Sequence, residues 1–71
     1  MKEVLLRQEP VELYKILKFE GLVNSGGEAK LHIDNGEVTV NGEVETQRRK
    51  KIKAGDVIVF QNESYKVGLV G

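Results

Sequence analysis

Apolar residues after Pro10 recur three and four positions apart, so that Leu13, Ile16 and Leu17 form one stripe along a helix. Pro10 suits the first position of that helix, because its fixed φ matches the helix and its missing N–H would have no partner there anyway. Gly21 suits the left-handed residue that ends a helix. The pattern predicts a first helix from Pro10 to about Gly21.

A second helix is predicted from Ser25 to about Ile33. The Ser25 hydroxyl can accept a hydrogen bond from a free backbone N–H while Glu28 reaches back to the cap, the pairing known as a capping box. Ala29 and Ile33 lie four apart and would face the first helix. Turn-forming residues at 34–36 then lead out of the helix.

From residue 37 the pattern changes to alternation, in which Val38 and Val40 point to one side of a strand. Asn41 and Gly42 tolerate the positive φ of a two-residue hairpin turn. Further strands are predicted over residues 43–46, 57–60 and 64–70, with turns at 54–56 and 61–63, and a short strand or helical turn over 3–7. The order predicts one α+β domain over residues 1–71: two packed helices followed by a small, mostly antiparallel β-sheet.

The composition offers little for catalysis. Seventy-one residues are too few to enclose a deep active site, and the chain has no cysteine and one histidine, His32. The acidic residues are spread along the chain without the spacing of a metal site. No apolar run approaches a membrane span. We therefore expect a non-enzymatic cytoplasmic protein without cofactor, metal or membrane contact.

The charge is divided unevenly along a chain whose net charge is zero. Residues 1–46 hold five basic and nine acidic residues, whereas residues 47–71 hold six and two. Four consecutive cations, Arg48 to Lys51, repel one another, and bound phosphate would relieve that repulsion. The alternative is a solvated face. A flat strand would send half of the run to each side, whereas a loop could gather it on one surface.

Two other features allow two interpretations each. Gly26 and Gly27 fall in the first turn of the second helix, where they serve either a tight interhelical turn or the close approach of a phosphate to the backbone. Tyr14, Phe19 and Phe60 could stack on bases, but packing in the core or at its rim is expected instead, because aromatic residues are few and form no exposed row.

Residues 11–60 resemble the S-four RNA-binding domain, the module named after ribosomal small-subunit protein four. The matching positions are Leu13, Leu17, Gly21, Ser25, Glu28-Ala29-Lys30, Ile33, Gly36, Val38, Val40-Asn41-Gly42, Ile52 and Gly55-Asp56-Val57-Ile58. Because the resemblance covers most of the chain, the chain looks most similar to the stand-alone bacterial group of the YaaA and YbcJ type.

The resemblance implies an αL motif, in which two packed helices and the following hairpin present a basic face to structured RNA such as rRNA or tRNA, and a ribosomal particle as a further partner. Carried over by position, the RNA-facing candidates are Lys18, Ser25, Gly26, Lys30, Arg48, Arg49, Lys50 and Lys51. One departure is Gly26, where many members of the family carry Arg or Lys. Backbone N–H groups would then take the place of that side-chain contact.

Two alternatives belong to other functional classes. The segment from Gly55 to Gly71 loosely resembles the small β-grasp sulfur-carrier proteins, but these need a C-terminal Gly-Gly, and this chain ends in Val70-Gly71. Their fold also accommodates two adjacent helices poorly. The other alternative is an assembly factor whose basic loop docks on protein.

Overall fold

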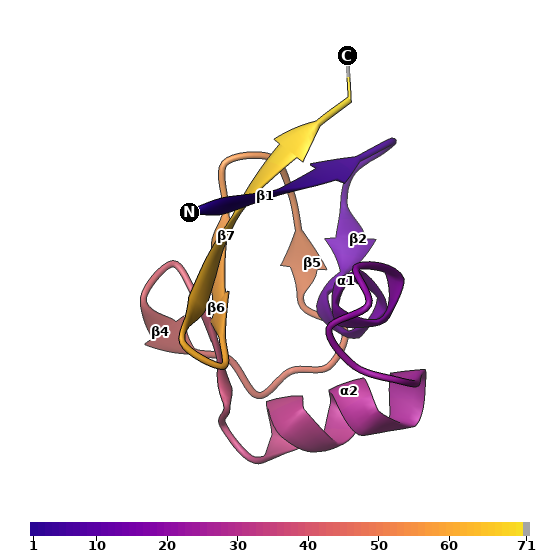
Figure 1. The fold of residues 1–71 in the computed structure, drawn as a ribbon, viewed down its shortest axis with the longest axis vertical. Helices are drawn as coiled ribbons and strands as arrows, with labels where there is room; N and C mark the ends of the chain where they lie inside the picture. The colour runs from indigo at the N-terminus through magenta and orange to yellow at the C-terminus, as the bar shows by residue number, and fades with distance from the viewer. Residues whose placement is uncertain (71) are drawn as a thin grey trace.

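The computed structural model describes residues 1–70. Its elements in chain order are β1 (Lys2–Leu6), β2 (Val11–Glu12), α1 (Leu13–Phe19), α2 (Gly26–Asp34), β3 (Val38–Val40), β4 (Glu43–Val44), β5 (Lys51–Ile52), β6 (Val57–Phe60) and β7 (Glu63–Leu69). In Figure 1 the two helices lie together at one end of the molecule, whereas β1 and β7 lie side by side toward the other. The predicted α+β fold is confirmed.

The main sheet has the strand order β1-β7-β6-β3-β4. Its pairs are antiparallel except for the parallel pair of β1 with β7, in which Val4 lies opposite Val67. The expectation of a mostly antiparallel sheet is therefore correct, and the segment near the N-terminus is a strand of that sheet. A second sheet of two short strands, β2 and β5, was not predicted.

The first helix begins later than predicted. Val11 pairs with Ile52 and Glu12 with Lys51, so the chain after Pro10 is extended and α1 starts only at Leu13. The prediction of Pro10 as the first helical residue is therefore wrong, because pairing with a strand 40 positions away outweighs the local preference. The predicted end is correct, since Gly21 has φ +72°.

The second helix matches its prediction closely. Ser25 caps α2, and its hydroxyl accepts a hydrogen bond from the backbone N–H of Glu28 at 3.1 Å. The Glu28 side chain accepts from Asn24 at 3.5 Å, so the reciprocal half of the capping box is replaced by a contact one residue earlier. Ala29 and Ile33 are fully buried, as expected for the face that packs on α1.

The hairpin at Asn41-Gly42 is also confirmed. Both residues have positive φ, +53° and +87°, and Val40 pairs with Glu43 across the turn. Strand β4 covers only Glu43–Val44 and is shorter than the predicted 43–46. The predicted turn at 61–63 is a second hairpin, in which Gln61 and Asn62 both have positive φ.

The core lies between the helices and one face of the main sheet. Its fully buried large side chains are Val4, Leu13, Ile16, Leu17, Ile33, Val38, Ile52, Ile58, Phe60 and Val67. Tyr14 is half-buried against this core, in line with the expected packing. Phe19 departs from that expectation, because 69% of it is exposed. Gly71, which bears on the carrier-protein alternative, lies outside the described residues.

Asp56 is the buried acidic residue of the described chain, with 6% of its surface exposed. Its carboxylate accepts hydrogen bonds from the Asn41 side chain and from the Lys53 backbone N–H, both at 3.0 Å. The Asn41 amide oxygen in turn accepts from the Val57 N–H at 2.9 Å. This network joins the turn before β6 to the hairpin after β3.

Burial raises the pKa of the Asp56 carboxyl, but the hydrogen bonds from Lys53 and Asn41 and the charges of Lys53 and Lys50 outweigh it. The pKa in the folded protein therefore lies below its ordinary value. A lowered folded-state pKa means that the ionised carboxylate stabilises the fold above the pKa of the unfolded chain, and that this stabilisation is lost as the pH falls through the folded-state value.

We predict that Asp56→Asn lowers the free energy of unfolding by roughly 1–3 kcal/mol at pH 7, because hydrogen bonds to a charged acceptor are lost. The difference from the unsubstituted protein should begin to shrink below about pH 4, where the unfolded chain takes up the proton, and should continue to shrink as the pH falls toward the lower folded-state pKa. Urea unfolding at pH 7 and pH 3 measures both effects. The exposed Glu3→Gln is the control and should change neither value; an equal deficit of Asp56→Asn at both pH values would contradict the role of the charge.

Candidate functional site

The basic loop, residues 47–50 together with Lys51 at its end, is held against the start of α1 by backbone hydrogen bonds. The prediction that Lys51 lies within the loop is wrong, because Lys51 pairs with Glu12 as the first residue of β5. The N–H of Leu13 donates to the Lys50 carbonyl at 2.9 Å, and the N–H of Tyr14 donates to the Arg48 carbonyl at 3.1 Å. The first N–H groups of a helix have no partner within the helix, and Glu12 provides no side-chain cap. The loop carbonyls therefore cap α1, which leaves the four cationic side chains exposed to solvent.

Arg48 also connects the loop to the end of α2. Its Nε donates to Asp34 Oδ1 at 2.9 Å, and its Nη2 donates to Asp34 Oδ2, so the guanidinium binds the carboxylate through two nitrogens. This hydrogen bond raises the pKa of Arg48 and lowers that of Asp34. The pair fixes the direction of Arg48 and neutralises part of its charge. Both side chains are exposed, so the pair contributes little to stability.

Glu12 lies at the centre of a cluster of three cations. Its carboxylate is 3.2 Å from Lys15 Nζ, 3.7 Å from Lys51 Nζ and 4.0 Å from Arg49 Nε. Desolvation raises the pKa of Glu12, but the hydrogen bond from Lys15 and the charges of the three cations outweigh it and lower the pKa overall. One negative charge thus holds three positive charges together, and the cluster keeps an excess of positive charge.

Tyr14 is the common neighbour of the loop and the two helices. Lys30 Nζ lies 4.8 Å from the centroid of its ring, within the range of a cation–π contact. Lys18 follows Tyr14 by four positions on α1 and therefore projects from the same side of that helix. Of the predicted candidates, Lys30 thus contacts the Tyr14 ring, and Arg48 contacts the Tyr14 backbone through its carbonyl group.

Gly26 is the first residue of α2 and lies beside the Tyr14 ring. A Cβ atom placed on it would meet that ring at 3.8 Å, an ordinary van der Waals distance, and its φ is not positive. The structure therefore gives no steric reason for glycine at this position, and both interpretations of Gly26 remain predictions.

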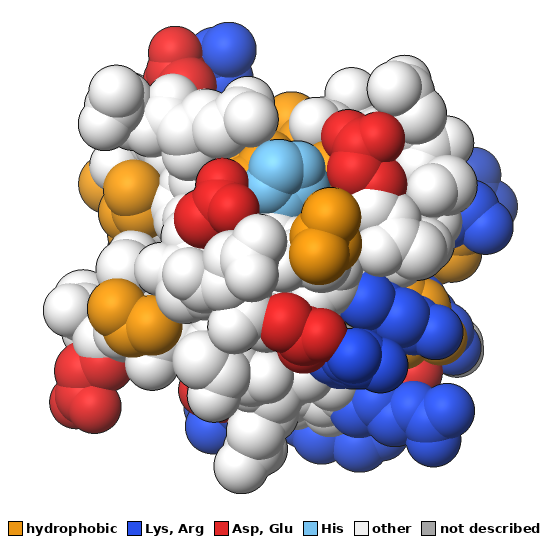
Figure 2. All heavy atoms as spheres, turned by 90° about the horizontal axis from the view of Figure 1, so that it is seen from below, with side chains coloured by type: hydrophobic (Ala, Val, Ile, Leu, Met, Phe, Trp, Pro, Cys, Tyr) orange, Lys and Arg blue, Asp and Glu red, His pale blue; other side chains and the backbone are white. Residues whose placement is uncertain are grey.

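The surface over α2 shows how the charges are arranged. In Figure 2, Lys and Arg side chains gather along one side of this face, whereas the histidine lies among acidic side chains on the other side. The histidine is His32, whose Nδ1 is 3.0 Å from Glu37 Oε1 and whose ring packs edge-on against Phe60. Its contacts are those of a helix residue packed at the rim of the core.

Three charged residues of this site were absent from the predicted set: Glu12, Lys15 and Asp34. The spacing of Glu12 and Lys15, three apart, is a recognisable signal for an ion pair on a helix. The pairing of Asp34 with Arg48 joins residues 14 positions apart and leaves no local signal.

Other kinds of site find no support in the part of the chain that the structure describes. No group of three His, Cys, Asp or Glu side chains among residues 1–70 could hold a metal ion. Neither helix is long and apolar enough to cross a membrane.

Comparisons with known proteins give a consistent result. The family model of the S4 domain matches residues 4–68. YbcJ of Escherichia coli (strain K12) is 47% identical over 57 residues, which cover 80% of this chain and 81% of YbcJ. RlbA of Bacillus subtilis (strain 168), named a probable ribosome maturation protein, is 38% identical over 53 residues, 75% of each chain. The solution structure of YbcJ, described as having an αL motif involved in RNA binding, matches with a TM-score of 0.72 and 43% identity over 96% of this chain and 87% of that one.

The cluster around Glu12 leads to a prediction about anion binding. We expect Glu12→Gln to bind polyanions more strongly, because Lys15, Arg49 and Lys51 lose the charge that partly neutralises them. The salt concentration that elutes the protein from immobilised heparin should therefore rise. Glu3→Gln changes the net charge equally at an exposed position of β1. Elution of both variants at the same salt concentration would show that Glu12 has no special influence on the cations.

Proposed function

Because the chain belongs to the S4 domain family, we propose that it binds structured RNA through one basic face, without catalysing a reaction. This face consists of the predicted residues Lys18, Ser25, Gly26, Lys30, Arg48, Arg49, Lys50 and Lys51, joined by Lys15. The observation that carries the proposal is the capping of α1 by the loop carbonyls. That contact holds cations from separate parts of the chain on one rigid surface.

Phosphate groups are the natural ligands of this face. A-form RNA has a deep, narrow major groove that side chains cannot read, so recognition depends on backbone contacts and on shape. Lys30 on α2 lies against Tyr14, and the loop that carries the other cations caps α1 at the same residue. Cations from two elements suit two phosphate backbones or a sharp bend in one of them. A folded RNA offers both arrangements.

The individual residues contribute differently. Arg49 and Lys51 share one carboxylate with Lys15 and keep free N–H donors for phosphate. Arg48 is already bound through two nitrogens to Asp34, so a phosphate must compete with that carboxylate or use a remaining donor. At the start of α2, Gly26 leaves the backbone N–H groups accessible to an anion beside the Ser25 cap.

The descriptions of two relatives support our proposal for the class of RNA. YbcJ is described as having an RNA-binding motif, and RlbA is named a probable ribosome maturation protein. We therefore propose rRNA or a tRNA-like structure as the ligand, a ribosomal particle as the setting and the cytoplasm as the location. Pull-down of the tagged protein before and after RNase treatment tests direct RNA binding. A protein partner retained after RNase treatment would favour an assembly factor that docks on protein instead.

The affinity for a folded RNA should fall steeply with salt, because each neutralised phosphate releases counterions. For about four phosphate contacts, log K plotted against log salt should have a slope of about −3 to −4. Fluorescence anisotropy with a labelled RNA hairpin over a range of KCl concentrations measures this slope. A flat response would exclude the electrostatic mechanism.

Replacing Arg48, Arg49, Lys50 and Lys51 together by alanine should remove most of the RNA affinity and leave the fold intact. The fold survives because the loop caps α1 through its carbonyl groups, which alanine retains. Lys30→Ala should cause a smaller loss, and the distant, exposed Lys2→Ala almost none. Anisotropy titrations give the ranking, and circular dichroism checks the fold. A loss for Lys2→Ala equal to that of the loop variant would indicate diffuse attraction and not a site.

A further inference from the structure

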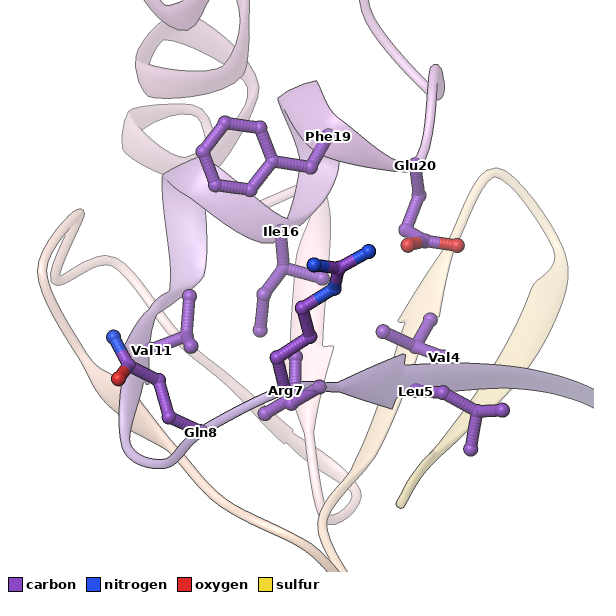
Figure 3. Close-up of a pocket in the computed structure, with 9 residues that line it drawn as sticks. Val4, Leu5, Arg7, Gln8, Val11, Ile16, Phe19 and Glu20 are labelled. Carbon is purple, nitrogen blue, oxygen red and sulfur yellow. The ribbon is translucent and has the colours of Figure 1, made fainter. Parts of the chain in front are cut away.

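Two clefts meet beside the C-terminal end of α1 and form one groove. The first, here called the β1–α1 cleft, has a volume of about 310 Å³ and an apolar lining from Val4, Leu5, Leu6, Val11, Ile16 and Phe19 (Figure 3). The second, of about 380 Å³, is lined in part by Glu12, Lys15 and Lys51 and is here called the cationic cleft. Gln8, Val11 and Phe19 line both clefts. An apolar hollow therefore opens directly onto cations of the basic face.

Phe19 lines both of these clefts. It is the last residue of α1 and follows Lys15 by four positions, so both side chains project from the same side of the helix. It is 69% exposed, although its ring is among the largest apolar side chains of the protein. A single exposed apolar residue is ordinary, but this ring stands where an apolar hollow and two lysines meet.

Polar groups lie at the rim of the β1–α1 cleft. Figure 3 shows the Arg7 side chain extending across the cleft toward Phe19 and Glu20, with Gln8 at one side. Within residues 1–70, Arg7 takes part in no ion pair. The cleft thus combines an apolar floor and one exposed aromatic ring with polar groups at its rim, which are the donors of Arg7 and Gln8 and the carboxylate of Glu20.

We propose that this groove binds one unpaired nucleotide of the RNA held by the basic face, an inference that rests on the proposed function. The base would enter the β1–α1 cleft and stack on Phe19, and its polar edge would meet Arg7 and Gln8. The phosphate of the same nucleotide would lie in the cationic cleft beside Lys15 and Lys51. The groove would then select RNA that carries a bulged or looped-out base next to a helix.

The size and the charge of the groove favour a nucleotide over the other occupants. A volume of about 310 Å³ lies at the lower end of ligand pockets, which suits one ring system. An apolar peptide would use the floor but would gain nothing from Lys15 and Lys51. A base in a duplex has its faces stacked and its edge paired, so it cannot enter. An unpaired nucleotide joins a flat apolar face, a polar edge and a phosphate in one unit.

Two RNA hairpins test the proposal, one fully paired and one identical except for a single bulged adenosine. The unsubstituted protein should bind the bulged hairpin roughly tenfold more tightly, the scale of stacking one base on an aromatic side chain. Phe19→Ala should abolish this preference and leave the affinity for the paired hairpin unchanged. Phe19→Tyr, which keeps an aromatic ring, should retain the preference for the bulged hairpin. Anisotropy titrations of each protein with both hairpins, at one fixed KCl concentration, measure these affinities.

Leu31→Ala is the matched control, because Leu31 is an apolar residue of α2, 58% exposed and outside both clefts. It should keep the full preference for the bulged hairpin. An equal preference in the unsubstituted protein and Phe19→Ala would overturn the inference while leaving RNA binding in place. Failure of the unsubstituted protein to bind either hairpin would instead overturn the proposed function.

Two further outcomes identify other occupants and would also overturn the proposal. One is that free AMP displaces the labelled bulged hairpin at concentrations as low as those at which the unlabelled bulged hairpin does. That result would show that the groove takes a mononucleotide and not part of an RNA. Self-association of the protein that is lost in Phe19→Ala, measured by sedimentation without RNA, would show that the groove is a contact with a second copy of the chain.

Discussion

The arrangement of the functional surface depends on the way in which α1 is capped. A helix normally satisfies its first N–H groups with a nearby side chain, as Ser25 does for α2. Helix α1 uses the carbonyl groups of Lys50 and Arg48 instead, which belong to a loop more than 30 residues further along the chain. The hydrogen bonds that cap α1 are therefore the same hydrogen bonds that hold the loop with its cations in place. Because the contact is made by the backbone, the capping of α1 does not engage the loop side chains.

The second constraint is the concentration of like charge on a neutral protein. Glu12 and Asp34 lie among the cations and reduce the repulsion that the cations would otherwise feel. A net charge of zero also means that the long-range attraction to RNA is weak, so that binding depends on contacts made within about one Debye length, roughly 8 Å at physiological salt.

The two flanks of α1 carry different chemistry although the helix has only seven residues. On one flank Tyr14 contacts Lys30 and stands beside the start of α2. On the other flank Lys15 and Phe19 border the groove that leads to β1. A single short helix thus carries a lysine and an aromatic ring toward the groove on one flank, and Tyr14 toward α2 on the other.

Local patterns in the sequence determined the second helix with its Ser25 cap, the Asn41-Gly42 hairpin and the alternation of β3, because each depends on residues within a few positions of one another. The basic run was also visible, and Arg48, Arg49 and Lys50 lie in a loop as expected, whereas Lys51 belongs to β5. The tertiary structure alone decided where α1 begins, because Val11 pairs with Ile52, and it alone placed Asp34 beside Arg48 and Phe19 in the lining of two clefts. These features come from contacts between residues far apart in the chain. Hydrophobic periodicity and secondary-structure propensity depend only on residues close together in the sequence. The elements could therefore be predicted from the sequence, whereas the surface that they form together could not.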